Sequence, residues 1–402
     1  MGVPDSVAII GAGIAGVRTA ERLRESGYAG AVTLVGAELD PPYDRPPLSK
    51  QVLRGERELV LLRAPDGYDA IGVELRLGLR ATGVDADGHR VTLDDGSTLP
   101  YAALVIATGA RPRTLPSAGL KGVHLLRSAG DCTRLRDDVA SARRAVVVGG
   151  GFIGCEVAAS LRMLGLDVTI VEMAPAPLLG VLGDRLAAEV VALHEAAGVT
   201  VRCGVGVAGL EGDDRVTGVR LQDGSCIPAD VVVVGLGVTP ELDWLSGSGI
   251  QVDDGVVCDS RGRTSAADVY AVGDVARWHD RRTGTSRRFE HWTSAVDQAA
   301  AVARDIVGAP DDDSEAMPAP YFWSDQYHVK IQSLGLPTAT AEQIVVLQPS
   351  AEKRLALYGD GGLLTAVVGL GATALVMKMR GALTEPTLFA DAVGRARALV
   401  AP

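Results

Sequence analysis

Two glycine-rich segments of this 402-residue chain have the spacing of dinucleotide-binding loops. Residues 11–16 are Gly-Ala-Gly-Ile-Ala-Gly, and residues 149–154 are Gly-Gly-Gly-Phe-Ile-Gly. In such a loop the first glycine permits a tight turn, the second lets the backbone approach a pyrophosphate, and the third lets a helix pack on a strand. The pattern predicts these three roles for Gly11, Gly13 and Gly16, and again for Gly149, Gly151 and Gly154.

An acidic residue follows each loop at about 20 residues, the distance at which a carboxylate can accept the hydroxyls of an adenosine ribose. These acids are Glu38 and Glu172, and for each the alternative is an exposed loop acid without a ligand. A carboxylate at position 172 repels a 2′-phosphate, and residues 173–176 contain no arginine to bind one. The sequence therefore predicts two dinucleotides, with NADH preferred to NADPH at the second site.

The same elements must position both loops. A buried strand is expected directly before each loop, at residues 7–10 and 145–148, and an amphipathic helix after it, at residues 17–25 and 155–164. A second apolar strand then leads to each acid, at residues 32–35 and 168–171. This repeat predicts an α/β fold with two Rossmann-like dinucleotide-binding domains.

Charge and cysteine content limit the classes of function that this chain can have. A net charge of −11 argues against broad nucleic-acid binding and against docking on an anionic membrane surface. The five cysteines are scattered, without a C-x-x-C pair or metal-ligand spacing, so we expect reduced thiols and no metal site. The first strand begins too early for a signal peptide, which favours a cytoplasmic location. Residues 361–377 are uncharged but glycine-rich, and we expect two short strands and a turn there.

Further motifs resemble a known group of proteins. Residues 104–112, 234–240 and 269–276, taken with the two loops in this order, resemble the two-dinucleotide flavoproteins of the glutathione reductase superfamily. Within it, residues 42–50 (Pro-Tyr-Asp-Arg-Pro-Pro-Leu-Ser-Lys) and 322–326 (Phe-Trp-Ser-Asp-Gln) resemble the oxygenase-coupled, NADH-dependent ferredoxin reductases of the putidaredoxin reductase-like family. The resemblance extends from residue 6 to about residue 330.

The resemblance implies a domain plan. A discontinuous FAD-binding domain is expected at residues 1–112 and 241–318, with an NAD-binding domain at 113–240 between its halves. A small α+β C-terminal interface domain is expected at 319–402, with a final helix near residues 390–399. Gly109 and Gly237 stand where the chain leaves and re-enters the FAD domain.

The resemblance also implies site residues. To the FAD site it assigns Gly11, Gly13, Ala15, Gly16, Glu38, Lys50, Ala81, Ala107, Thr108, Gly109, Arg127, Asp274 and Trp292. To the NAD site it assigns Gly149, Gly151, Ile153, Gly154, Glu156, Glu172 and Gly237.

Lys50 and Glu156 are the candidate catalytic residues, since the family places this lysine beside the flavin, where a cation stabilises the anionic reduced ring. Simpler roles stay open. Asp274 can cap a following helix, Ser49 can cap another in a stiff surface loop, and Glu156 can be a first-turn acid favoured by the helix dipole.

The implied activity is hydride transfer from NADH to flavin N5, followed by single-electron transfer to a [2Fe-2S] ferredoxin that serves a cytochrome P450 or a Rieske oxygenase. The lack of a cysteine pair excludes a disulfide reductase, which must relay electrons through two thiols. A rubredoxin reductase, an NADH:quinone or dye reductase and an NADH-responsive regulatory flavoprotein remain alternatives. For docking an acidic ferredoxin, the candidate basic patch is Arg281, Arg282, Arg287 and Arg288.

Overall fold

The computed structural model describes residues 2–116, 119–281, 283–309 and 317–401, and the chain divides into two compact units. The first unit contains Met1–Asp44, Val60–Arg111 and Val238–Pro318. The second contains Arg45–Leu59, Pro112–Gly237 and Ala319–Pro402. Each unit holds one of the two glycine loops.

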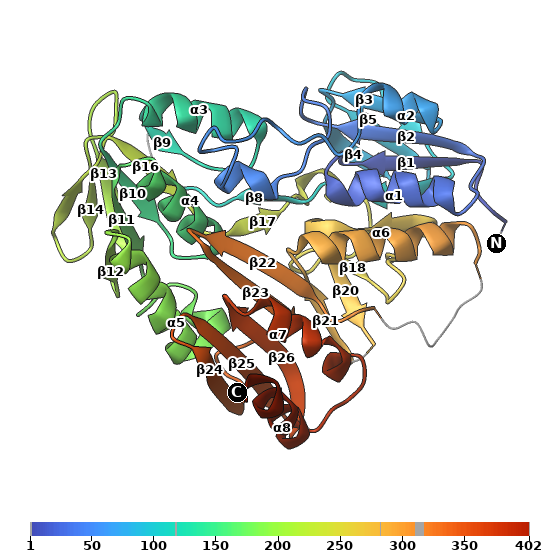
Figure 1. The fold of residues 1–402 in the computed structure, drawn as a ribbon. Coiled ribbons are helices and arrows are strands. Elements are labelled where there is room, and N and C mark those ends of the chain that lie inside the picture. The colour runs from blue at the N-terminus through green and yellow to red at the C-terminus, as the bar shows by residue number, and fades with distance from the viewer. Residues whose placement is uncertain (1, 117–118, 282, 310–316, 402) are drawn as a thin grey trace. The chain divides into compact units, whose positions relative to one another are not determined.

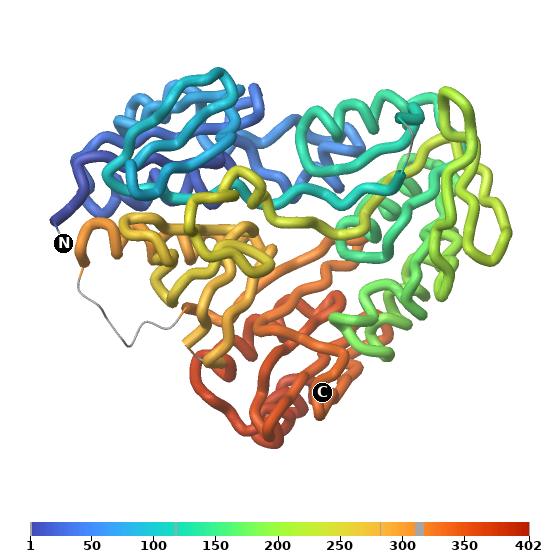
Figure 2. Tube along the Cα trace, turned by 180° about the vertical axis from the view of Figure 1, so that it is seen from behind, coloured from blue at the N-terminus to red at the C-terminus, as the bar shows by residue number. Residues whose placement is uncertain are grey.

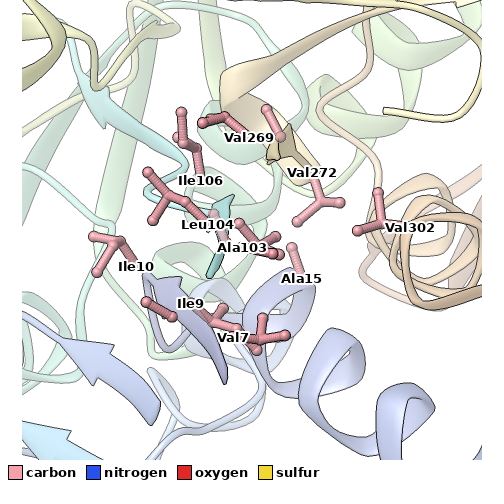
Figure 3. Close-up of a cluster of buried hydrophobic side chains, with 14 of the residues drawn as sticks. Val7, Ile9, Ile10, Ala15, Ala103, Leu104, Ile106, Val269, Val272 and Val302 are labelled. Carbon is pink, nitrogen blue, oxygen red and sulfur yellow. The ribbon is translucent and has the colours of Figure 1, made fainter. Parts of the chain in front are cut away.

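The first unit is built on a parallel sheet with strand order β19-β7-β1-β2-β3. Its strands are β1 (Ser6–Ile10), β2 (Ala31–Gly36), β3 (Val73–Leu77), β7 (Ala103–Ile106) and β19 (Val269–Ala271). The central strands are nearly continuous apolar runs, as expected where both faces of a parallel sheet are covered. Figure 3 shows their side chains meeting in one cluster with Ala15, Val272 and Val302. Helix α1 (Ile14–Glu25) packs against α6 (Trp292–Ile306) (Figure 1).

Smaller elements complete the first unit. One antiparallel sheet joins β4 (Ala81–Asp85), β5 (Arg90–Leu93) and β6 (Thr98–Pro100). A second joins β18 (Val256–Cys258), β20 (Ala276–Asp280) and β21 (Thr285–Arg288). The remaining elements are β8 (Ala110–Pro112), which pairs with β17 (Val238–Pro240), and the short helices α2 (Asp66–Ala70), η2 (Asp243–Leu245) and η3 (Gly273–Val275).

The second unit repeats the parallel design with strand order β12-β11-β10-β16-β9. Its strands are β9 (Val123–His124), β10 (Arg144–Val148), β11 (Asp167–Glu172), β12 (Thr200–Cys203) and β16 (Val231–Val234). Around them lie η1 (Pro46–Ser49), α3 (Ala129–Val139), α4 (Phe152–Met163), α5 (Leu179–Ala196), and the antiparallel strands β13 (Val207–Glu211), β14 (Gly218–Leu221) and β15 (Cys226–Pro228). The Rossmann-like fold class predicted from the repeat is confirmed.

The C-terminal segment of this unit forms an antiparallel sheet with strand order β22-β23-β26-β25-β24. The strands are β22 (Tyr321–Gln326), β23 (Val329–Gly335), β24 (Gln343–Ser350), β25 (Lys353–Asp360) and β26 (Leu363–Leu370). One face packs on α7 (Thr373–Lys378), η4 (Arg380–Leu383) and α8 (Phe389–Val400). The other face packs on α5, and Tyr358 Oη donates to the Leu182 carbonyl at 2.8 Å. Figure 2 shows the green trace of α5 beside these red strands.

Several local predictions can now be judged. The strands and helices around both loops and the final helix are confirmed within a few residues. The prediction for residues 361–377 was wrong, since strand β26 is followed there by helix α7. Asp274 lies within the short η3, which leads directly into β20, so the helix expected directly after Asp274 is not formed. No helix among the described residues is long and apolar enough to cross a bilayer.

Candidate functional site

The first glycine loop, in the first unit, has the backbone that a bound pyrophosphate requires. Gly11 has φ of +115°, and its N–H donates to the Val35 carbonyl at 2.8 Å. A Cβ at Gly11 would lie 2.1 Å from the Ala107 carbonyl oxygen, and one at Gly16 would lie 1.9 Å from the Gly11 carbonyl oxygen. Only glycine fits at both positions. A Cβ at Gly13, in contrast, would meet nothing within 4 Å, so the loop is open at the start of α1, where N–H groups favour an anion.

Two further segments border this loop. The turn after β7 brings Ala107 against Gly11, and Thr108 Oγ1 donates to the Glu241 carbonyl at 3.1 Å. A Cβ at Gly273 would lie 2.8 Å from that of Ala15, so Asp274 follows directly on the residue that touches α1. The structure thus gathers two sequence-predicted segments, residues 107–109 and 273–274, around the predicted FAD loop.

Glu38 and Trp292 are also held in the first unit. The Tyr43 hydroxyl donates to Glu38 Oε2 at 2.5 Å. Trp292 begins α6, and its Nε1 donates to Asp44 Oδ1 at 2.8 Å. Tyr43 and Asp44 both come from the motif at residues 42–50, which therefore positions two of the predicted FAD residues. Ala81 begins β4 and is buried.

The second loop, in the second unit, has nearly the same backbone. Gly149 has φ of +106°, and a Cβ there would lie 2.3 Å from the Gly235 carbonyl oxygen. A Cβ at Gly154 would lie 2.0 Å from the Gly149 carbonyl oxygen, whereas one at Gly151 would meet nothing within 4 Å. The residues present therefore fit a second dinucleotide, with its phosphates at the start of α4.

Glu172, at the end of β11, turns toward this loop. Its Oε2 accepts the Gly150 N–H at 2.6 Å, and its Oε1 accepts the Ala174 N–H at 2.7 Å. The carboxylate is therefore fixed beside the loop rather than loose on the surface, which argues against the alternative of an unliganded loop acid. Beside it Met173 is 75% exposed, and Ile153 on α4 is 49% exposed.

A buried ion pair is the other chemical feature of the second unit. Lys50 Nζ lies 2.6 Å from Glu156 Oε2, and both residues are at most 5% exposed. The same oxygen accepts the Ser49 hydroxyl at 2.5 Å, and Glu156 Oε1 accepts the Ser324 hydroxyl at 2.7 Å. Glu156 is thus a paired, fully hydrogen-bonded carboxylate and not a solvated first-turn acid.

Sequence reasoning missed two members of this cluster. For Ser49 the sequence left open the role of a helix cap in a surface loop, but Ser49 is the last residue of η1, is buried, and binds Glu156. Ser324 comes from β22, far along the chain, and its only sequence signal was membership in the motif at residues 322–326. A single serine in a strand gives no indication of what it contacts.

Two residues assigned to the FAD site belong to the second unit, namely Lys50 and Arg127. Arg127 precedes α3, and its N–H donates to Asp131 at 3.1 Å. In the NAD set, the Gly237 carbonyl accepts the Arg113 N–H at 2.9 Å, and Gly237 has φ of +82°. The roles of these residues toward the cofactors stay predictions.

The buried thiols are not suited to relay electrons. All five cysteines are free, and three of them are buried. Burial raises the pKa of Cys132 to about 11, and it also raises the pKa values of Cys155 and Cys258. A protonated, enclosed thiol is a poor nucleophile.

The predicted basic patch is only partly supported. Arg288 is engaged by Glu290 at 2.5 Å and by Asp254 at 3.6 Å, with its side chain 10% exposed. Arg281 Nε donates to Ser260 Oγ at 2.8 Å, and Arg287 is exposed. Arg282 lies outside the described residues. The charge of Arg288 is therefore neutralised, and a docking role of the patch stays a prediction.

Comparison with known proteins agrees with these features. Residues 5–299 match the family described as pyridine nucleotide-disulphide oxidoreductase, and residues 321–396 match the reductase C-terminal family. The chain belongs to the pyridine nucleotide-disulphide oxidoreductase family. The predicted flavoprotein identity and the use of FAD with a nicotinamide dinucleotide are thereby confirmed.

Individual relatives are similar over most of their length. The chain is 40% identical to rhodocoxin reductase of Rhodococcus erythropolis, over 85% of this chain and 80% of that protein. It is 39% identical to the ferredoxin reductase component of the chlorobenzene dioxygenase of Cupriavidus sp. strain PS12, over 98% and 97%. The crystal structure of the covalent putidaredoxin reductase–putidaredoxin complex aligns with a TM-score of 0.89 at 36% identity, over 94% and 93%.

Proposed function

We propose that this chain is an FAD-dependent NADH:ferredoxin reductase. The observation that carries the proposal is the duplicated glycine loop, present once in each unit and each time followed by a held carboxylate. Two such loops serve two dinucleotides, and the family assigns FAD to the first. The similarity to ferredoxin reductases of oxygenase systems supports the choice of acceptor.

Bound FAD supplies the chemistry that the polypeptide lacks, because it accepts a hydride from NADH and releases the two electrons one at a time. The chain provides binding and electrostatics. Gly13 and Gly151 leave room for the pyrophosphates, Glu38 and Glu172 bind the ribose hydroxyls, and Asp274 contributes to the FAD cradle. Lys50, held by Glu156, supplies the positive charge that favours reduced flavin.

The three-domain plan is part of this proposal. The FAD domain comprises residues 1–112 and 241–318, the NAD domain 113–240, and the C-terminal interface domain 319–402. The match of residues 321–396 to a separate C-terminal family supports the last boundary. Segment 45–59 nonetheless clusters with the second unit. We also propose a cytoplasmic location, where the free thiols of the described cysteines persist.

The electron acceptor is proposed to be a [2Fe-2S] ferredoxin of a cytochrome P450 or Rieske oxygenase system. The names of two relatives support this class: one reductase was captured in a complex with putidaredoxin, and another is the ferredoxin reductase component of a dioxygenase. A net charge of −11 leaves no reason to propose a nucleic-acid or membrane partner.

The test is anaerobic reduction of the purified holoprotein by NADH, followed by addition of a [2Fe-2S] ferredoxin with cytochrome c as the final acceptor. We expect the flavin absorbance to bleach and cytochrome c reduction to depend on ferredoxin. Bleaching without ferredoxin-dependent turnover would move the function to a quinone, a dye, rubredoxin or a regulatory role. Absence of bleaching would disprove the proposal.

A further inference from the structure

A row of buried polar side chains continues from the Lys50–Glu156 pair into the C-terminal sheet. Gln326 Nε2 lies 3.3 Å from Ser324 Oγ, and Gln326 Oε1 lies 3.1 Å from His194 Nε2. The Tyr327 hydroxyl lies 3.0 Å from His194 Nδ1. Ser324, Gln326 and His194 are 0% exposed, so water does not compete for these bonds.

The donors in this row all point toward Glu156. Burial lowers the pKa of His194 to about 4, so its imidazole is neutral at neutral pH and one ring nitrogen donates while the other accepts. Because Gln326 donates through Nε2 to Ser324, its Oε1 faces His194 and takes the proton of His194 Nε2. The Tyr327 hydroxyl then donates to His194 Nδ1.

This order fixes the rotation of the Ser324 hydroxyl. Because Ser324 Oγ accepts from Gln326, its own proton goes to Glu156 Oε1 at 2.7 Å. The other carboxylate oxygen is held by Ser49 and Lys50, so neither oxygen of Glu156 can turn away. Packing supports this arrangement, since Phe322 of β22 meets Phe152 of α4 with ring centroids 4.9 Å apart.

We propose that Ser324, Gln326 and His194 are positioning residues that hold the Glu156 carboxylate, and through it the Lys50 ammonium, in the geometry used for flavin reduction. The inference rests on the proposed function, in which Lys50 acts on the flavin. It assigns the first strand of the C-terminal sheet, β22, a part in hydride acceptance in addition to any part in docking. An amide cannot readily pass a proton on, so the row orients groups and is not a proton path.

The first test compares Ser324→Ala with Ser333→Ala. Ser333 is also 0% exposed, lies in the neighbouring strand β23 opposite Phe322, and its hydroxyl lies 3.5 Å from the Gly335 carbonyl oxygen. Loss of a hydrogen bond to a buried charge should slow flavin reduction at saturating NADH by about tenfold in Ser324→Ala. The apparent Kd for NADH should stay within about twofold, because no nucleotide contact is removed. Equal rates in the two variants would overturn the inference.

Two further variants separate positioning from folding. Ser324→Thr keeps the hydroxyl and should recover most of the rate if it folds, as judged by thermal unfolding and flavin content. Gln326→Met, which frees the Ser324 hydroxyl to rotate and also removes the acceptor of the His194 Nε2 proton, should lower the rate by about threefold. Combined with Glu156→Gln, Ser324→Ala should add little further loss, because both act through one carboxylate. Full additivity would contradict the proposal.

An infrared measurement keeps this inference separate from the proposed function. The difference spectrum between wild type and Glu156→Gln identifies the carboxylate band of Glu156, with or without NADH. We expect Ser324→Ala to shift this band and Ser333→Ala to leave it in place. An unshifted band would refute the role of Ser324 even if NADH reduces the flavin normally. A shifted band in a protein that NADH does not reduce would instead show that the proposed function has failed.

Discussion

The two glycine loops have almost the same backbone but place their acids differently. Gly11 and Gly149 have φ of +115° and +106°, and each is closed off by a carbonyl oxygen of a neighbouring strand turn. In the strand registers, Gly36 in the first unit corresponds to Glu172 in the second, because Ile10 pairs with Val35 and Val148 with Val171. The first loop therefore takes its acid two residues later, at Glu38.

The second residue of each loop differs in step with the position of the acid. In the first unit Ala12 occupies that position, and a Cβ at Gly36 would lie 2.8 Å from its Cβ. In the second unit Gly150 occupies it, and a Cβ there would lie 3.1 Å from Glu172 Oε2 and 2.9 Å from the Pro177 Cβ. In the first unit the methyl group of Ala12 fills the space beside the loop, and in the second unit the carboxylate of Glu172 fills it. The same backbone geometry thus accommodates an acid at two different positions after the loop.

The helices after the loops differ as well. Position 18 on α1 holds an arginine that pairs with Glu21 on the same helix. The corresponding position on α4 holds Glu156, which is buried and pairs with Lys50 from a distant segment. The start of the second helix thus carries the charged pair that we propose for catalysis.

The strongest test of the comparison changes the first glycine of each loop. Gly11→Ala should abolish FAD retention, because its Cβ would collide with the Ala107 carbonyl oxygen at 2.1 Å and φ is positive. Gly149→Ala should retain FAD and lose reduction by NADH. Flavin content and anaerobic bleaching measure both. Gly394→Ala, on α8 with open space around it, is the control and should change neither. Identical losses in both loop variants would mean that the loops do not serve separate nucleotides.

A smaller effect is expected from the ion pair. Lys50→Met should lower the free energy of unfolding by about 3–5 kcal/mol, because Glu156 would remain charged and buried without its cation. Arg18→Met should cost about 1 kcal/mol or less, since Glu21 keeps Arg63 at 3.0 Å. Urea titration of the two holoproteins checks this difference. Similar losses would show that burial does not distinguish the two helices.

Two histidines also oppose protonation, His291 in the first unit and His194 in the second. Burial lowers the pKa of His194 and of His291 to about 4, against the hydrogen bond that His194 donates to Gln326 and the charge of Asp274 respectively. The unfolded chain takes up these protons near pH 6.5, so the stabilisation is complete above that pH and is lost as pH falls toward 4. Between pH 7 and pH 5 each histidine should cost about 2 kcal/mol.

Unfolding titrations at the two pH values measure this loss. His194→Gln should be less sensitive to acid than wild type by the share of one histidine. A variant with the same pH dependence as wild type would show that His194 is not held neutral in the native state.

The smallest effect concerns the acids themselves. Glu172→Gln should reduce the NADH over NADPH ratio of kcat/KM by about tenfold, because it removes the charge that repels a 2′-phosphate. Glu38→Gln should weaken FAD binding and leave that ratio unchanged. Steady-state kinetics with both donors, after FAD saturation, provides the measurement. An unchanged ratio in Glu172→Gln would show that the carboxylate does not select the nicotinamide.

Local spacing was enough to predict the Rossmann repeats, and it placed the helices after both loops within a few residues. These features depend on residues that are close in sequence, since a glycine loop is one turn with fixed steric demands. Features that depend on contacts between distant parts of the chain were less predictable from the sequence. Residues 361–377 were wrongly divided into two strands, because a short apolar segment does not reveal whether it pairs with a sheet or covers it.

The sequence by itself determined the fold class, the two nucleotide loops and the lack of a C-x-x-C pair, because each follows from residue types at short, fixed intervals. Only the tertiary structure decided that Ser49 and Ser324 hold Glu156, and that His194 and Gln326 direct the Ser324 hydroxyl. These groups come from separate elements, and a buried carboxylate acquires its donors only when the chain folds them around it.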